Sequence, residues 1–203
     1  TELFIDTSDH RRMVGSIYKG RVQNVIPGMQ AAFVDIGYEL NSFLPFSEIG
    51  NTDNLKNLSF DDDDDKKKIN KKSKSSYKDL KVNDSILVQV IKEPFSGKGP
   101  RVTTDISIPG SLMVLVPNEN YIGISRKIKD KYEKRRLRKI AEQLRPEGFG
   151  LIIRTIAQGL EEEKLKTDYK RVWKTWKLVE SKSKTKKSPY VVYKDFDTSE
   201  QVV

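Results

Sequence analysis

The feature that most constrains the fold is a series of short β-rich runs, broken by Gly and Pro, in the first half of the chain. The stretch Gly15–Ile49 contains the runs SIYKGRVQNVI, PGM and QAAFVDIGYELNSFLPF. Strand character returns over Val82–Phe95 and Arg101–Ile108, with the turn SGKG between them. Short strands joined by tight turns are typical of a small sheet or barrel. We therefore expect these runs to form one five-stranded sheet.

A charged block interrupts this β-rich half. The segment Asn51–Lys78 contains DDDDDKKKINKKSKSS, which offers almost no apolar surface to offset the entropy of ordering. We interpret it as a solvated insertion, with the alternative that Lys66–Lys74 adds a loose contact to phosphates. Asp61–Asp65 are rejected as a catalytic cluster, because a low-complexity run does not hold the octahedral geometry of magnesium.

The second half of the chain mixes strands with helices. The apolar runs Leu112–Val116 and Gly150–Ala157 predict two strands. Apolar residues recur at helical spacing between Ser125 and Arg145, and again in a longer stretch that includes Leu165 and Val179. This spacing predicts two amphipathic helices, the first of them strongly basic.

Composition limits the classes of function. With 203 residues and 36% hydrophobic content the chain can bury one or two modest cores. Lys and Arg number 38 against 29 acidic residues, and the net charge of +9 favours a polyanionic partner such as nucleic acid. The absence of cysteine excludes disulfides, thiolate catalysis and cysteine-ligated zinc within this chain. No apolar run approaches the roughly 20 residues needed to cross a bilayer.

Three aromatic or titratable residues are assigned no function. His10 lies in a polar turn without a candidate nucleophile beside it, and we interpret it as a surface residue. Trp173 and Trp176 fit the apolar face of the second predicted helix, so we expect them in the core.

The first β-rich stretch also contains the residue types that hold a single-stranded nucleic acid. These are rings that stack on bases and cations that neutralise phosphates, here Phe33, Phe43, Tyr18, Lys19 and Arg21. An aromatic residue in a strand belongs more often to the core. The residue types alone therefore leave both interpretations open.

The order of several motifs resembles the ribonuclease E/G family. The string GSIYKGRVQNVIPGMQAAFVDIGYELNSFLPFSEI resembles the S1-type RNA-binding domain as it occurs in that family. It is followed, in the family's order, by KGPRVTTDISIPG, VLVPN, GISRKI and PEGFGLIIRT. Each string alone is weak, but the ordered series is specific and covers nearly the whole chain except the charged insertion.

This resemblance implies an α+β fold. An S1-type five-stranded barrel of the oligonucleotide-binding (OB) fold is expected at 15–108, with the charged insertion at 51–78. An α+β 5′-sensor unit is expected at 109–187. Strands at 1–14 and 188–203 are expected to be fragments of a ribonuclease H-like subdomain.

The resemblance also implies the RNA contacts. Phe33 and Phe43 are expected to stack on bases and Lys98 to contact the RNA backbone. Arg126 and Lys127 match further RNA-contacting positions. Lys127 stands where the family often has arginine, which puts bidentate pairing at this position in doubt.

A second expected site prefers RNA whose first nucleotide carries a 5′ monophosphate. The resemblance implies that Arg154 pairs with that phosphate, that Thr155 hydrogen-bonds to it, and that Gly110 and Val114 line the pocket through their main chain. A guanidinium offers phosphate a rigid fork of donors. A pocket sized for one phosphate would exclude a triphosphate. Without the resemblance, an Arg-Thr pair at a strand end is commonplace.

The implied function is that of the RNA-binding, 5′-monophosphate-sensing part of an endoribonuclease that cleaves single-stranded RNA in RNA processing and decay. In the family the acids that bind catalytic magnesium, and a zinc-containing linker that joins subunits, lie in later segments. We therefore expect this chain to be part of a longer, homo-oligomeric protein of the bacterial cytoplasm, or of a plastid. We expect it to hold no cofactor and to leave RNA uncut on its own. The alternative is a non-catalytic S1-type protein acting in RNA regulation or ribosome assembly.

Overall fold

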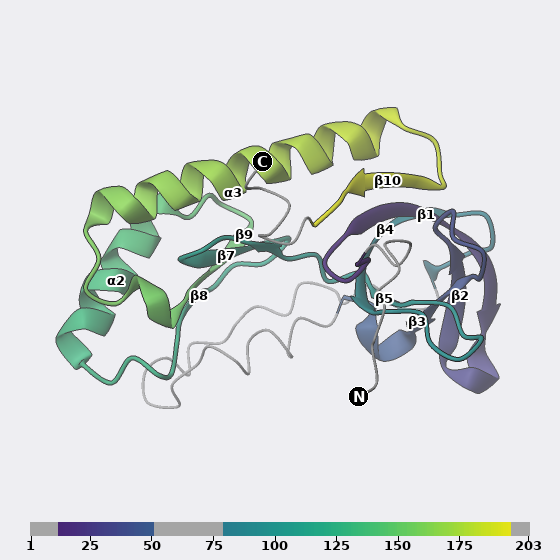
Figure 1. The fold of residues 1–203 in the computed structure, drawn as a ribbon, viewed down its shortest axis with the longest axis horizontal. Helices are drawn as coiled ribbons and strands as arrows, with labels where there is room; N and C mark the ends of the chain where they lie inside the picture. The colour runs from purple at the N-terminus through teal and green to yellow at the C-terminus, as the bar shows by residue number, and fades with distance from the viewer. Residues whose placement is uncertain (1–11, 51–78, 196–203) are drawn as a thin grey trace, which may run out of the picture.

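The computed structural model describes residues 12–50 and 79–195. In this part the chain forms a six-stranded and a four-stranded sheet, one toward each end of an elongated molecule (Figure 1). Residues 1–11 of the strand fragment expected at 1–14, with His10 among them, and the charged insertion lie outside the described residues.

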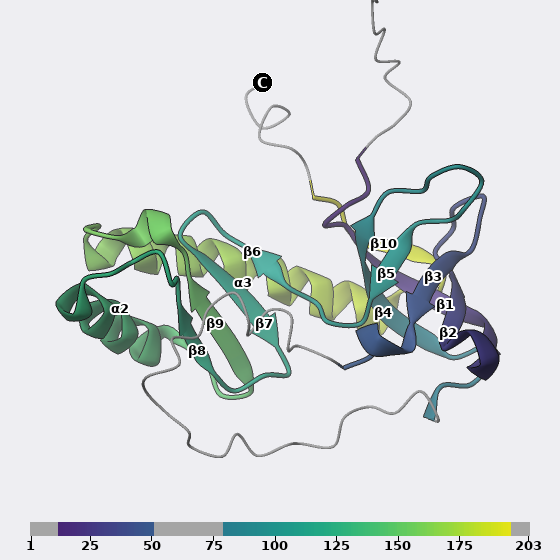
Figure 2. The same cartoon turned by 90° about the horizontal axis from the view of Figure 1, so that it is seen from below.

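The first sheet closes into a barrel, because β1 pairs on one side with β2 and on the other with β4. The strand order is β1-β2-β3-β5-β4, which confirms the predicted five-stranded barrel (Figure 2). Short 3-10 turns follow β1 and β3. The elements of this part are β1 (Ile17–Ile26), η1 (Pro27–Met29), β2 (Ala31–Asp35), β3 (Ser42–Pro45), η2 (Phe46–Glu48), β4 (Ser85–Lys92) and β5 (Arg101–Thr103).

Alternation along the barrel strands separates a buried from an outward face. In β2, Ala32 and Val34 are fully buried, whereas Phe33 and Asp35 between and after them are only partly covered. The inward side chains pack into one apolar cluster, which includes Leu44, Val88, Val90 and Val102. Because successive side chains in a strand point to opposite faces, the outward positions are left for contacts with a partner.

The second sheet has the order β6-β7-β9-β8, with β7 and β9 antiparallel and β8 and β9 parallel. Helices α2 and α3 pack against this sheet. Helix α3 continues past the sheet toward the barrel (Figure 1). The elements are β6 (Ile108–Pro109), β7 (Met113–Pro117), β8 (Ile122–Ile124), α2 (Lys131–Leu144), β9 (Phe149–Ile153), η4 (Thr155–Ala157) and α3 (Glu162–Thr185).

Both predicted helices are present, although the first starts later than its apolar pattern suggests. The Asp130 side chain accepts a hydrogen bond from the Tyr132 N–H at 2.8 Å, so it caps the helix and fixes its start at Lys131. Trp173 and Trp176 pack edge to face on Phe149, with ring centroids 5.2 and 5.8 Å apart. They border the core, as their position on the helix predicts.

The strand predicted over Arg101–Ile108 is wrong as a single element. Arg101–Thr103 completes the barrel, whereas Ile108 pairs with Leu115 in the second sheet. The Gln89 side chain bridges the break, because its amide nitrogen donates to the carbonyl oxygens of Gly15 and Ser107 and its oxygen accepts from the Ser107 N–H. The chain therefore changes sheets between these strands.

The end of α3 is tied to the barrel. Lys19 Nζ donates to the carbonyl oxygens of Ser183 and Lys186 at 2.7 and 2.8 Å, and Arg21 donates to that of Ser188 at 2.8 Å. Strand β10 (Tyr190–Tyr193) then pairs antiparallel with β1. The assignment of this strand to a ribonuclease H-like fragment stays a prediction.

The two sheets share a hydrophobic core. Ile17 of β1 and Val192 of β10 are fully buried in the same cluster as Leu115, Leu151 and Leu165 of the second unit. Barrel and second unit are thus packed together in the described part of the chain, which fixes the sites on them relative to each other.

Candidate functional site

A pair of phenylalanines lies on the outward face of the barrel. Phe33 of β2 and Phe43 of β3 are direct antiparallel partners, and their ring centroids lie 5.9 Å apart at an interplanar angle of 64°. Both side chains are half-buried, while the flanking Ala32, Val34 and Leu44 point into the barrel. The pairing holds the two rings edge to face at the surface, a geometry that aromatic pairs favour.

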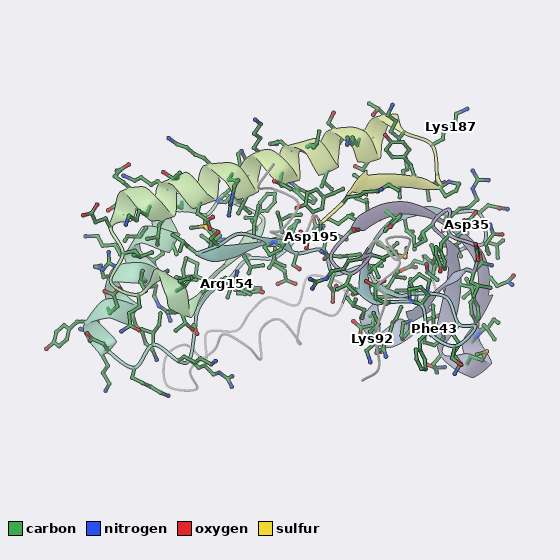
Figure 3. The ribbon with its side chains drawn as sticks, viewed as in Figure 1. Asp35, Phe43, Lys92, Arg154, Lys187 and Asp195 are labelled. Carbon is green, nitrogen blue, oxygen red and sulfur yellow. The ribbon has the colours of Figure 1, made fainter. Side chains whose placement is uncertain are left out.

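Two cations continue this pair across the sheet. Phe43 is in register with Arg101 of β5, and Arg101 with Lys92 of β4. In-register partners lie on one face of a sheet, and Arg101 is partly exposed while its neighbour Val102 is fully buried. We call Phe33, Phe43, Arg101 and Lys92 the ring surface; Figure 3 shows Phe43 and Lys92 on the side of the barrel away from α3.

Sequence analysis did not identify Arg101 and Lys92. Their place beside the rings depends on the parallel pairing of β3 with β5, strands that are separated by the charged insertion and β4. The Arg101 guanidinium is held by the Glu48 carboxylate at 3.2 Å. It is therefore oriented by the barrel itself.

Lys98 lies at the tip of the β4–β5 hairpin. Phe95 and Lys98 exchange two backbone hydrogen bonds of 3.1 and 3.0 Å around Ser96 and Gly97, both of which have positive φ. A Cβ at the following Gly99 would lie 2.1 Å from the Asn41 carbonyl oxygen. Glycine is thus needed where the hairpin meets the chain just before β3, and this contact places the exposed Lys98 near the strand of Phe43.

Tyr18, Lys19 and Arg21 do not belong to the ring surface, although their residue types fit it. Tyr18 is only 7% exposed, and burial raises the pKa of its hydroxyl. Lys19 donates to a carbonyl group in the last turn of α3, and Arg21 donates to one just after the helix. Tyr18 is therefore part of the barrel core, whereas Lys19 and Arg21 attach the barrel to the end of α3 and the residues after it.

A second site lies where β9 ends. The pocket has a volume of about 600 Å³ and opens to solvent. We call it the Arg154 pocket; it is lined by Ser111, Val114, Ser125, Ile152, Ile153, Arg154, Thr155 and Ile156. The pocket is larger than a single phosphate, so its volume alone does not exclude a longer phosphate chain. Figure 3 shows Arg154 below α3.

Arg154 is fixed to the turn before β7 at two points. Its backbone N–H donates to the Leu112 carbonyl at 2.8 Å, and its guanidinium donates to the Gly110 carbonyl at 2.7 Å. Among the described residues this is the one hydrogen bond of the guanidinium, so other donors of its planar fork are available for an anion.

Hydroxyl groups complete the pocket. The side-chain oxygens of Thr155 and Ser125 are hydrogen-bonded at 2.6 Å, and Val114 pairs with Ile152 on the sheet beneath them. The structure thus brings the predicted Val114, Arg154 and Thr155 together in one pocket, and it adds Ser111 and Ser125, which sequence analysis did not identify. Gly110 is not among the lining residues, but its carbonyl group accepts the hydrogen bond from Arg154.

The predicted Arg126 and Lys127 directly follow Ser125. Both side chains are exposed in the turn between β8 and α2. They place positive charge beside the Arg154 pocket, at the edge nearest to α2.

Metal-ligand clusters and membrane-spanning helices are both absent from the described residues. In 12–50 and 79–195, acidic side chains do not gather in groups of three that could hold a metal ion. In the same ranges, neither helix combines the length and the apolar character that a bilayer span requires.

Comparisons with known proteins match both units. The family model described as "Ribonuclease E/G family" matches residues 107–203, and that of the S1 RNA binding domain matches residues 11–102. Ribonuclease G of Salmonella typhimurium is 35% identical over 208 residues, which cover 100% of this chain and 40% of that protein. Ribonuclease G of Haemophilus influenzae is 40% identical over 186 residues, covering 90% of this chain and 36% of the relative.

Ribonuclease E of a Nostoc species is 34% identical over 203 residues, with 100% of this chain and 27% of the relative covered. The chain spans two fifths or less of the length of these relatives. Both units are matched in the order in which the structure places them, and the identity extends over the whole chain. The chain therefore belongs to the ribonuclease E/G family.

Proposed function

We propose that this chain is the part of a ribonuclease E/G-type endoribonuclease that holds single-stranded RNA and senses its 5′ end. The barrel would bind the body of the RNA through the ring surface and Lys98. The second unit would bind a 5′ monophosphate in the Arg154 pocket. Figure 3 shows Phe43 and Lys92 of the ring surface, and Arg154 of the pocket, below α3.

The observation that carries this proposal is the double anchoring of Arg154. The Gly110 carbonyl holds the guanidinium, whose remaining donors belong to the same pocket that the Thr155 and Ser125 hydroxyls line. Fixed N–H and O–H donors are suited to phosphate oxygens. The pocket volume of about 600 Å³ fits a terminal nucleotide with its phosphate better than a free anion.

The ring surface supports the second half of the proposal. Base stacking on rings contributes about 1 to 3 kcal/mol per base and tolerates any base. Arg101 and Lys92, in register with the rings, would neutralise phosphates of the same strand. A non-catalytic RNA-binding protein would share this surface, but the relatives that match the whole chain are named ribonucleases.

Cleavage itself is assigned to other parts of the parent protein. Acidic residues there would hold magnesium beside the scissile phosphate, and a zinc-containing linker would join subunits into a homo-oligomer. The bacterial relatives favour a bacterial cytoplasm as the place of action.

The test pairs binding with cleavage. Short A/U-rich single-stranded RNAs carrying a 5′ monophosphate, triphosphate or hydroxyl are titrated with the full chain, and fluorescence anisotropy gives the dissociation constants. The same mixtures are incubated with magnesium and analysed on gels. We expect tightest binding to the monophosphate and no cleavage.

Equal binding of the three RNAs would overturn the 5′-sensing role and favour a ribosome-assembly or regulatory protein. Cleavage by the pure chain would place an active site within it. Absence of any RNA binding at moderate salt would remove the whole proposal.

A further inference from the structure

Helix α3 contributes a buried carboxylate next to the Arg154 pocket. Asp168 is 7% exposed, and its oxygens accept hydrogen bonds from the backbone N–H groups of Ser111, Leu112 and Met113 at 3.1, 2.8 and 3.3 Å. Burying a carboxylate is costly unless hydrogen bonds compensate it. Three N–H donors from one turn make the contact specific to that turn.

The same turn is packed tightly on α3. A Cβ at Gly110 would lie 2.5 Å from an Asp168 oxygen and 2.6 Å from Val172. Arg171 donates to Asp168 and to the Ser111 hydroxyl, each at 2.8 Å. Hydrogen bonds to the Asp168 carboxylate and the close approach at Gly110 therefore hold the Gly110–Met113 turn against α3.

Carbonyl groups of the same turn hold Arg154. The carbonyl oxygens of Gly110 and Leu112 accept from the Arg154 guanidinium and backbone N–H, respectively. Three N–H groups of the turn thus point to Asp168, and two of its carbonyl groups point to Arg154. A rotation of the turn would move both Arg154 anchors at once.

We propose that Asp168 is a positioning residue for the Arg154 pocket, which it keeps in shape through the Gly110–Met113 turn and with the help of Arg171. The inference rests on the proposed 5′-monophosphate sensing by this pocket. Asp168 lies on α3 and does not line the pocket, so it would act on the selection of the RNA 5′ end only through the turn that it holds.

The test uses Asp168→Asn, which keeps the size of the side chain but replaces one acceptor oxygen by an NH₂ group facing N–H donors. The control is Val179→Ala, a fully buried residue three turns later on α3 whose loss destabilises the helix without touching the turn. Because Asp168→Asn can impair folding, Arg171→Ala serves as a milder second variant of an exposed partner. Arg154→Ala defines complete loss of the pocket.

The readout is the ratio of the dissociation constants for 5′-hydroxyl and 5′-monophosphate RNA, measured with the full chain. We expect Asp168→Asn to lower this ratio by roughly tenfold, or to 1 if the wild-type ratio is smaller, because charge-assisted hydrogen bonds are lost. Arg171→Ala lowers it less. Val179→Ala lowers the melting temperature and leaves the ratio unchanged. The affinity for 5′-hydroxyl RNA stays unchanged in Asp168→Asn, Arg171→Ala and Val179→Ala.

Three results are separable. A wild-type ratio of 1 contradicts the proposed function itself. A wild-type preference that Arg154→Ala removes, but that both folded Asp168→Asn and Arg171→Ala keep, contradicts only the positioning role. A preference reduced equally by Val179→Ala would make Asp168 a stabilising residue without a specific part in selection.

Discussion

The ring surface and the Arg154 pocket differ in how many elements are needed to form them. Phe33 and Phe43 lie on consecutive strands and face each other through one antiparallel pairing. The pocket combines the turn before β7, the residue after β8 and the residues after β9, and α3 lies behind that turn. The first site depends on strand register, whereas the second depends on a series of hydrogen bonds between distant segments.

This difference predicts different properties. Stacking on rings depends on exposed apolar area and is only weakly screened by salt, so the barrel would supply affinity under most conditions. A phosphate held by fixed donors loses binding as soon as one donor shifts. The pocket would therefore supply selectivity for the RNA terminus and be the more sensitive of the two to mutation.

The largest effect is expected from removing both rings. The double substitution Phe33→Ala and Phe43→Ala should weaken binding of every RNA by about 1 to 3 kcal/mol for each base that loses its stacking partner. The salt dependence and the 5′-monophosphate preference should remain, because no phosphate contact is changed. Anisotropy titrations at several salt concentrations measure both.

The control is Tyr132→Ala, which removes a ring that is 83% exposed at the start of α2 and belongs to neither site. It should bind RNA like the wild type. Normal affinity of the double variant would contradict the stacking role, and a lost 5′ preference would show that the two sites are not separable.

The next effect concerns the pocket alone. Arg154→Ala should abolish the 5′-monophosphate preference, a loss of about 1.5 to 3 kcal/mol for a charged hydrogen-bonded contact. Arg154→Lys should keep part of it, since lysine retains the charge without the planar fork. Binding of 5′-hydroxyl RNA should stay unchanged in both variants. Retention of the preference in Arg154→Ala would place the phosphate elsewhere.

The same contrast between near and distant contacts determines what the sequence could predict. The five barrel strands and both helices follow from local patterns, such as the β-rich runs around Phe33 and the helical spacing between Leu165 and Val179. Phe33 and Phe43 fit a stacking role by residue type, but only the family resemblance selected that role over a place in the core. The Arg154 pocket was foreseen only because its motifs resemble a family. Its residue types alone would have been assigned to an ordinary strand end.

The sequence-based assignments of site residues fail where a contact with a distant segment determines the role of a side chain. Lys19 and Arg21 look like phosphate ligands, but the end of α3 packs on β1 and uses their donors. Arg101 joins the rings through a pairing between strands far apart in the chain. Asp168 resembles any acidic residue on a helix until the turn at Gly110 is seen against it. Spacing within one segment contains no information about these partners.

A smaller effect is expected at Glu133, which contributes to the stability of the second unit but does not line the Arg154 pocket. Glu133 accepts from the Gly159 N–H and pairs with Arg136, both at 2.8 Å, and so ties α2 to the segment after Thr155. Its hydrogen bonds with Arg136 lower the pKa of Glu133 from 4.5 to about 2. A carboxyl group with a lowered folded pKa stabilises the protein above its unfolded pKa and loses that contribution as the pH falls.

Glu133→Gln should therefore reduce the free energy of unfolding by about 1 to 2 kcal/mol at pH 7. The difference from the wild type should shrink as the pH falls from about 4.5 toward 2. Urea denaturation at a series of pH values measures this. Glu180→Gln, which removes a partly exposed carboxylate from α3, should change little. A difference that persists at pH 2 would mean that the charge of Glu133 is not its cause.

The smallest effect tests whether Lys98 belongs to the RNA path of the barrel. Lys98→Ala should reduce the slope of log affinity against log salt by about 0.7, the value for one phosphate contact on a single strand. The matched control is Lys170→Ala, which removes the same charge from the exposed face of α3. If long-range attraction alone were responsible, both variants would bind alike, and an unchanged slope in Lys98→Ala would exclude its phosphate contact. A change in Lys98→Ala alone would extend the RNA path from the rings to the tip of the β4–β5 hairpin, because Gly99 packs on the chain just before Phe43.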